Sequence, residues 1–260
     1  MNLLFIFISL FFSFQDYTLA FELEEEVNFI YRDNLDNLYL VDDYTIKKFD
    51  TKGNLMFSYS DNYLGKISSV SIGEGLKVYV YYNNNAQLVL LDNTLSNLSP
   101  PLTLNFYNLG TSSLQCSSIQ NRYWFYDPLQ GAIIRTTNTF SEVFNSGNLD
   151  QLLGLDLEVN FMTEWGNNLY LVDEKNGVFV FDIFGTYKKT IPIYGLKSIQ
   201  VSEKGLFYIE EKKLKYYDFE SFLFQEISTP LTTIDNALIS SKMLYIEQAN
   251  RIIAFKRNTY

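Results

Sequence analysis

The chain carries one identical internal duplication, the hexapeptide NLYLVD, which occupies positions 37–42 and returns at positions 168–173. Two interpretations compete. Asp42 and Asp173 could be paired carboxylates of a copied catalytic element, or the hexapeptide could belong to a repeating scaffold. Further copies decide between them, because a scaffold repeat recurs along the whole chain at a similar period.

Weaker copies of the hexapeptide do recur, so that six related blocks follow one another. The blocks begin at Leu38, Lys77, Tyr123, Leu169, Leu206 and Met243, with spacings of 39, 46, 46, 37 and 37 residues. An irregular period of about 41 residues with strand-like content has the length of a propeller blade rather than of a solenoid coil.

Each block has similar flanking segments. A second strand-like segment follows about seven to ten residues later, then a turn and a third strand in most units, and one more short strand precedes each block. No amphipathic helical segment is longer than a turn or two. We therefore predict an all-β fold, a six-bladed β-propeller of four-stranded antiparallel blades, with residues 21–260 forming a single domain.

The first 20 residues have the pattern of a cleaved signal peptide. The stretch 3–14 is apolar apart from two serines, and it is too short to span a bilayer, which needs about 20 residues. Thr18 to Ala20 then form a small-x-small cleavage pattern, although no Lys or Arg precedes the apolar stretch. We predict a signal peptide over residues 1–20, cleaved after Ala20, and a periplasmic or secreted protein that does not insert into the membrane. No cysteine follows the apolar stretch, so the sequence does not support a lipid anchor.

The sixth unit is too short to contain its own outer strand. After Arg251–Lys256 only four residues remain, whereas Ala20–Glu24 near the N-terminus alternates apolar and acidic residues. We predict that this N-terminal strand, directly after the signal peptide, completes the last blade and closes the ring. Such a closure would also cover an exposed strand edge.

Two segments carry a family resemblance. Leu38–Ser60 and Leu169–Ile193 share a strand ending in Asp, a second strand ending in Phe-Asp, and a turn with Gly. In this pattern they resemble NHL-type repeats and, more loosely, the six-bladed propellers of the bacterial cell envelope. The resemblance covers all six units and is clearest in units one and four. It implies the fold and a role as a binding platform, and it carries no particular activity, because this fold hosts many.

The residue types that the chain lacks exclude several chemistries. The sequence contains no histidine, which excludes a Ser-His-Asp triad, a Cys-His pair and His-ligated metals. The single cysteine, Cys116, lies in a strand-like segment and is interpreted as a small buried hydrophobe. The formal net charge of −10 disfavours binding to nucleic acid. We therefore assign no catalytic residue and no cofactor, and we predict that the protein is not an enzyme.

The acids that end the repeated blocks have a structural interpretation. They are Asp42, Asp127, Asp173, Glu210 and Glu247. An acid present in five of six units serves something that every blade needs, such as ending a strand by accepting hydrogen bonds from backbone N–H groups. Asp42 and Asp173 lie three units apart, so in a six-fold ring they should face each other across the disc, too far apart to cooperate.

An alternative function requires a metal ion in the central channel. Six-bladed propellers of the lactonase or strictosidine-synthase kind hold such an ion with acids and amides of their innermost strands. The corresponding residues here are Asn28, Asn160, Glu164, Asp235 and Asn236. A Ca²⁺ site can be built from such oxygen ligands without histidine. The alternative is thus a propeller hydrolase or lyase, although we assign no metal ligand from the sequence.

A binding surface is the favoured candidate site. Tyr63, Tyr107, Pro128, Tyr194 and the 83–85 asparagines are expected on one face of the disc, together with the long loop 145–158. The apolar residues of this loop are Leu149, Leu152, Leu153 and Leu155. The loop either folds a helical turn over its own blade or presents an apolar patch to a partner. We predict an exported, monomeric, non-enzymatic platform that binds a protein partner or a ligand in the bacterial envelope.

Overall fold

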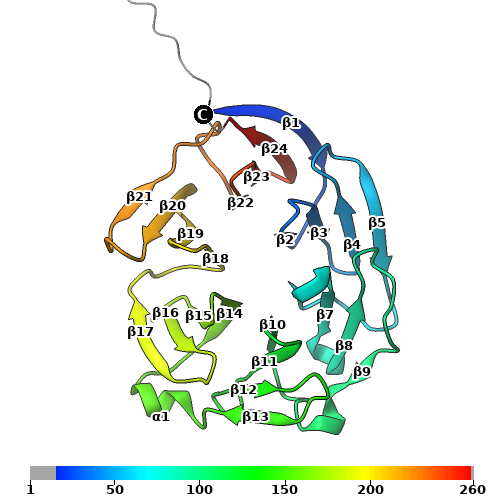
Figure 1. The fold of residues 1–260 in the computed structure, drawn as a ribbon, viewed down its shortest axis with the longest axis vertical. Helices are drawn as coiled ribbons and strands as arrows, with labels where there is room; N and C mark the ends of the chain where they lie inside the picture. The colour runs from blue at the N-terminus through cyan, green and yellow to red at the C-terminus, as the bar shows by residue number, and fades with distance from the viewer. Residues whose placement is uncertain (1–15, 259–260) are drawn as a thin grey trace, which may run out of the picture.

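A computed structural model describes residues 16–258, and these form six four-stranded antiparallel sheets arranged in a ring (Figure 1). The protein is an all-β six-bladed propeller, as the repeats predicted. The predicted signal peptide falls largely on residues 1–15, which lie outside the described part of the chain. Within residues 16–258, no helix has the length and apolar character needed to cross a bilayer.

The blades follow one another in chain order around the ring, and each runs from its innermost to its outermost strand. Blade 1 contains β2 (Phe29–Arg32), β3 (Leu38–Val41), β4 (Thr45–Phe49) and β5 (Leu55–Ser60). Blade 2 contains β6 (Ser69–Ile72), β7 (Val78–Tyr82), β8 (Gln87–Leu91) and β9 (Leu102–Thr103). Blade 3 contains β10 (Leu114–Ser118), β11 (Arg122–Asp127), β12 (Ala132–Thr136) and β13 (Glu142–Asn145).

The remaining blades have the same plan. Blade 4 contains β14 (Val159–Trp165), β15 (Asn168–Asp173), β16 (Gly177–Asp182) and β17 (Tyr187–Ile191). Blade 5 contains β18 (Gln200–Val201), β19 (Gly205–Glu210), β20 (Lys213–Asp218) and β21 (Phe224–Glu226). Blade 6 contains β22 (Asn236–Ile239), β23 (Met243–Gln248), β24 (Arg251–Arg257) and β1 (Tyr17–Glu24). Short helices lie in the connections: η1 (Glu74–Leu76), η2 (Asn83–Asn85), η3 (Leu104–Tyr107) and α1 (Leu149–Leu153).

The second strand of each blade is apolar at nearly every position because both of its faces are covered. In β15, Leu169 and Leu171 pack towards blade 3, whereas Tyr170 and Val172 pack towards blade 5. Successive side chains of a strand point to opposite faces, so each strand contributes to two interfaces. We call each interface between successive blades a seam. The hydrophobic core is thus six apolar clusters, one in each seam.

The ring is closed by its first strand. β1 pairs antiparallel with β24, from Tyr17 opposite Arg257 to Glu24 opposite Arg251, with a register shift at Ala20. The predicted closure is therefore present, but the strand begins at Tyr17, four residues before the Phe21 start that cleavage after Ala20 would give. Cleavage after Ala20 would leave the half of β1 that starts at Phe21. The Tyr17 ring contacts the Phe255 ring edge-on at 6.5 Å, which adds packing to the earlier half.

Candidate functional site

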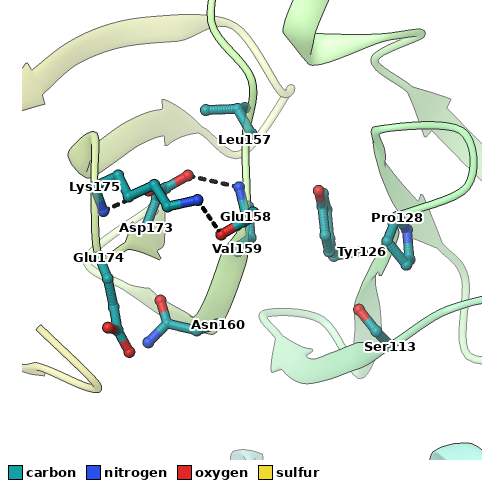
Figure 2. A pocket seen from close by; sticks show the side chains of 10 residues that line it. All are labelled: Ser113, Tyr126, Pro128, Leu157, Glu158, Val159, Asn160, Asp173, Glu174 and Lys175. Carbon is teal, nitrogen blue, oxygen red and sulfur yellow. Dashed lines mark hydrogen bonds and ion pairs between the residues drawn. The ribbon is translucent and has the colours of Figure 1, made fainter.

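A groove of about 520 Å³ lies between blades 3 and 4 (Figure 2). It opens on the face that carries the loops joining the two middle strands of each blade, where sequence analysis placed a binding surface. Its lining residues are Ser113, Tyr126, Pro128, Leu157, Glu158, Val159, Asn160, Asp173, Glu174 and Lys175. Pockets that hold small ligands or single side chains of a partner have volumes of roughly 300–1,000 Å³.

Asp173, the acid of the second NLYLVD copy, builds the blade 4 wall. One carboxylate oxygen accepts hydrogen bonds from the backbone N–H groups of Lys175 and Asn176 at 2.8 and 2.9 Å. The other accepts from the Glu158 N–H at 2.7 Å and from the Asn176 amide at 3.1 Å. Asp173 is fully buried, so its carboxylate fixes both the turn and the incoming strand but is saturated.

Asp127 has the same role on the blade 3 wall. It accepts from the Leu129 N–H at 2.9 Å, from the Gln130 amide at 2.7 Å and from the Thr111 hydroxyl at 2.5 Å. Asp42 likewise accepts from two N–H groups of its own turn. These contacts confirm that these three acids end strands, and blades 1 and 4 lie across the ring from each other (Figure 1).

Three groups of the groove keep hydrogen-bonding capacity for a ligand. The Tyr126 hydroxyl makes no hydrogen bond among residues 16–258, and burial raises the pKa of Tyr126 to about 12, with nearby carboxylates adding to the rise. Asn160 donates its amide to the carbonyls of Leu196 and Lys197 at 3.0 and 3.1 Å, but its buried carbonyl oxygen has no partner. Glu174 is exposed beside it (Figure 2).

The charge of the groove is mainly negative. Lys175 is its only cation, and the Lys175 ammonium is paired with the Glu158 carboxylate at 2.6 Å. That leaves Glu174 without an ion pair among the described residues. Leu157, Val159, Pro128 and the Tyr126 ring supply apolar surface next to it. The arrangement suits a partner group that combines a cation with an apolar stem.

The predicted binding loop forms one wall beside this groove. Leu149 is fully buried and Leu153 is half-buried against the same core cluster, so the loop does fold a helical turn, α1, over its own blade. Leu152 and Leu155 are 60% and 40% exposed, respectively. The structure therefore divides the four leucines into two that belong to the core and two at the surface. Leu157, two residues further on, enters the groove itself.

The other predicted surface residues are dispersed. Tyr63 and Tyr194 are 99% and 57% exposed, and Pro128 lines the groove. Tyr107 instead packs its ring 4.9 Å from the Phe140 ring. Sequence reasoning missed Tyr126, Glu158, Glu174 and Lys175. For Tyr126, Glu174 and Lys175 the available signal was their position within two residues of the strand-ending acids Asp127 and Asp173, whereas Glu158 is the last residue of the predicted 145–158 loop.

The residues considered for a channel metal do not fit one site. Glu164 accepts hydrogen bonds from the Ser118 hydroxyl, the Ile119 N–H and the Trp124 indole. Asp235 is paired with Lys212, and Asn28 donates its amide to Asp43. In residues 16–258, no three Asp, Glu or Cys side chains come together as a metal cluster.

Cys116 is buried, and burial raises its thiol pKa well above the ordinary value.

Comparisons with solved structures show the fold alone, because every identity is low. The WD40 domain of Neurospora crassa Pan2 has a TM-score of 0.68 at 8% identity, covering 94% of this chain and 96% of that one. Virginiamycin B lyase from Staphylococcus aureus has a TM-score of 0.63 at 13% identity, covering 93% and 100%. A Bacteroides fragilis protein, provisionally described as exported, has a TM-score of 0.62 at 10% identity, covering 94% of each chain. A variant of the lyase in which a histidine is replaced by alanine is described as catalytically inactive. No protein-family model matches the chain, and no curated protein matches it.

Proposed function

We propose that this protein is an exported, monomeric, non-enzymatic propeller that binds a protein partner in the bacterial envelope through the groove between blades 3 and 4. The observation that carries the proposal is the composition of the groove. Its lining combines apolar residues with polar groups that lack a partner, and the exposed Leu152 and Leu155 lie in the neighbouring loop. Binding sites generally combine a concave apolar surface with a few positioned polar groups.

Export is supported by the N-terminus of the sequence. The apolar stretch 3–14 and the cleavage pattern at Thr18 to Ala20 match a signal peptide, and one similar structure is provisionally described as exported. The mature protein would work in the periplasm or outside the cell. A chain with a single buried cysteine suits that compartment, because it needs no disulfide for stability.

The non-enzymatic function is supported by the chemistry of the side chains. The chain has no histidine, so it cannot supply the residue whose loss inactivates virginiamycin B lyase. The buried acids Asp127 and Asp173 have their carboxylates occupied by hydrogen bonds from their own turns and from Thr111 and Glu158, respectively. The alternative of a hydrolase or lyase with a channel Ca²⁺ has weaker support, because Glu164 and Asp235 already have partners.

Site-specific crosslinking tests the proposed binding face. A photo-crosslinking residue placed at position 152 or 155 should capture one discrete envelope protein in living cells. The same residue at position 35, which is equally exposed but lies on the opposite face, should not capture it. Replacing both Leu152 and Leu155 by Asp should reduce recovery of that protein at least about tenfold, since it removes apolar contact area.

Folding must be unchanged for that result to count. Both leucines are exposed, so the double substitution should leave the free energy of unfolding within about 0.5 kcal/mol of the wild-type value. Undiminished capture by the double variant would exclude this face as the binding site. A melting temperature that falls on chelation, with one Ca²⁺ bound per chain, would instead favour the hydrolase or lyase.

A further inference from the structure

The turns joining the third and fourth strands of blades 1 to 5 share one closing hydrogen bond, and the blade 5 turn is one residue longer than the other four. Each turn contains one residue in the left-handed backbone conformation. The N–H of the first residue of the turn donates to the carbonyl of the residue directly after the left-handed one, at 2.8–3.0 Å. The left-handed residues are Gly53 (φ 85°), Leu95 (φ 60°), Phe140 (φ 62°), Gly185 (φ 81°) and Phe222 (φ 60°). Glycine adopts this conformation freely, whereas a bulky side chain there is an outlier that needs an explanation.

Two of these positions are glycines because an aromatic ring of the preceding blade occupies the space. A Cβ at Gly53 would lie 2.7 Å from the Phe21 ring of β1. A Cβ at Gly185 would lie 2.0 Å from the Phe144 ring of β13. In both seams the outer strand of the preceding blade thus seals the turn with a phenylalanine.

Two further positions carry side chains that are themselves buried. Leu95 is 4% exposed and packs in the seam between blades 1 and 2, where Phe57 of β5 also packs. Phe140 is 6% exposed, and Tyr107 from η3 of the preceding blade covers it at 4.9 Å between ring centroids. In these turns, burial of the side chain compensates for the unfavourable backbone conformation.

Phe222 has no such compensation. Its side chain is 61% exposed, and the next residues along the chain, Leu223 and Phe224, are 59% and 53% exposed. The neighbour from the preceding blade is a lysine and not an aromatic residue. The Lys189 ammonium lies 5.6 Å from the centre of the Phe222 ring. Three consecutive exposed apolar residues on one turn are unusual for a monomer surface.

Lys189 and three aromatic residues form one continuous surface, which we call the blade 4–5 aromatic patch and define as Lys189, Phe219, Phe222 and Phe224. The Lys189 ammonium also lies 5.4 Å from the Phe219 ring. Phe219 and Phe224 both contact the Tyr217 ring, at 6.1 and 5.0 Å. Among residues 16–258, no carboxylate forms an ion pair with Lys189.

We propose that the blade 4–5 aromatic patch docks an acidic peptide segment of a partner protein through one aromatic side chain. The partner's ring would cover Phe222 as Tyr107 covers Phe140 within this protein. A neighbouring carboxylate of the partner would pair with the Lys189 ammonium, which has no carboxylate partner of its own. Aromatic anchors with a paired charge are the usual centre of small peptide-binding surfaces.

Peptide selection tests this proposal directly. A random peptide library is selected on the immobilised wild-type protein after depletion on the Phe222→Gly variant. Enriched peptides should carry Phe, Tyr or Trp next to Asp or Glu. A fluorescein-labelled peptide of the enriched sequence should bind the wild type and lose at least about tenfold in affinity on Phe222→Gly and on Lys189→Glu.

Matched variants make the outcome decisive. Phe222→Gly places glycine where two sister turns already have it, so the fold should persist, as circular dichroism would verify. Leu129→Ala, at an 80% exposed residue on the opposite face, should leave peptide affinity unchanged. Failure to enrich any peptide, enrichment of peptides without aromatic or acidic residues, or equal binding to Phe222→Gly would each overturn the proposal. So would a wild-type dimer in sedimentation velocity that Phe222→Gly dissociates, because the occupant would then be a second copy.

Discussion

The two seams of blade 4 are built from the same repeating unit and differ at their outer ends. Between blades 3 and 4, Arg135 stacks over Trp124 and donates to the Ile183 carbonyl at 2.6 Å, and Phe144 fills the space above Gly185. Arg135 is paired with Phe144 across the sheet, and at the equivalent position of blade 4 Val180 is paired with Lys189.

The difference shows that two residue changes are enough to alter the packing at one end of a seam. The backbone pairing of the two blades is the same, with a register shift at the same place in the outer strand. Substituting lysine for phenylalanine on the outer strand, and phenylalanine for glycine on the next turn, leaves aromatic surface uncovered. At the face that carries the turns between third and fourth strands, the seam between blades 3 and 4 is thus closed by aromatic packing, whereas the seam between blades 4 and 5 is open.

The largest predicted effect is the loss of the buried cation in the sealed seam. Arg135 is 3% exposed, and its guanidinium donates to the Ser118 hydroxyl oxygen. The Ser118 hydroxyl in turn donates to the Glu164 carboxylate at 2.5 Å. Arg135→Ala should lower the free energy of unfolding by roughly 3–5 kcal/mol, because it leaves a cavity at a buried site and removes the charge that compensates the half-buried Glu164 carboxylate. Urea denaturation followed by tryptophan fluorescence measures this loss.

The matched substitution in the open seam is Lys189→Ala. Its side chain is exposed, so the stability change should stay within about 0.5 kcal/mol. Equal destabilisation by the two substitutions would show that both seams are structural ties and would remove the contrast between them.

The second prediction compares substitutions at the left-handed positions of the two seams, Gly185 and Phe222. Gly185→Ala should cost roughly 1–3 kcal/mol, because a Cβ there meets the Phe144 ring at 2.0 Å and the φ of 81° is unfavourable. Phe222→Gly should change stability by no more than about 1 kcal/mol, since relief of backbone strain offsets the entropy that glycine adds to the unfolded chain. Thermal unfolding by differential scanning calorimetry compares the two variants.

A Phe222→Gly loss as large as that of Gly185→Ala would contradict this expectation. It would mean that the Phe222 ring contributes to the core in solution. The blade 4–5 aromatic patch would then be a covered part of the seam and not a free surface.

The smallest predicted effect concerns the acid that begins the blade 5 turn. Hydrogen bonds from the Ser221 N–H and hydroxyl lower the pKa of Asp218 below its ordinary value. A lowered folded-state pKa gives stability that is present above the unfolded-state pKa and is lost as pH falls through the folded-state value. Asp218→Asn should therefore reduce the drop in melting temperature between pH 6 and about pH 3, without changing its direction. An identical pH dependence in the variant would show that this carboxylate does not anchor the turn.

The sequence predicted the parts of the fold that depend on periodicity. Nearly continuous apolar residues in the NLYLVD blocks indicated strands that pack between blades, and the recurrent acids indicated strand ends. The sequence pattern predicts outer strands over 140–144 and 222–227, and both begin too early. Phe140 and Phe222 lie in turns at positive φ instead of in β13 and β21. Strand propensity favours phenylalanine, and no local signal marks a left-handed phenylalanine.

The groove and the aromatic patch were beyond sequence reasoning for a physical reason. Phe140 and Phe222 occupy equivalent turns and look alike in sequence, yet one is covered by Tyr107 and the other faces Lys189. The difference comes from the residues of the preceding blade, Tyr107 and Lys189, which lie about 33 positions before each phenylalanine along the chain. The four leucines of the 145–158 loop divided in the same way, because the α1 turn directs only two of them to the core.

The pairing of β1 with β24 has a consequence for how the chain folds. Thr18 and Asn258, which are hydrogen-bonded to each other, lie 240 positions apart, so this contact joins the two ends of the described chain. Five blades consist of sequence neighbours and can assemble as each hairpin is completed, whereas the sixth has to wait for both ends. Contacts between residues so far apart in sequence form slowly, because the entropy of closing the loop is lost before any pairing is gained. A nascent chain whose N-terminus is still engaged elsewhere would keep an open ring with an incomplete sixth blade.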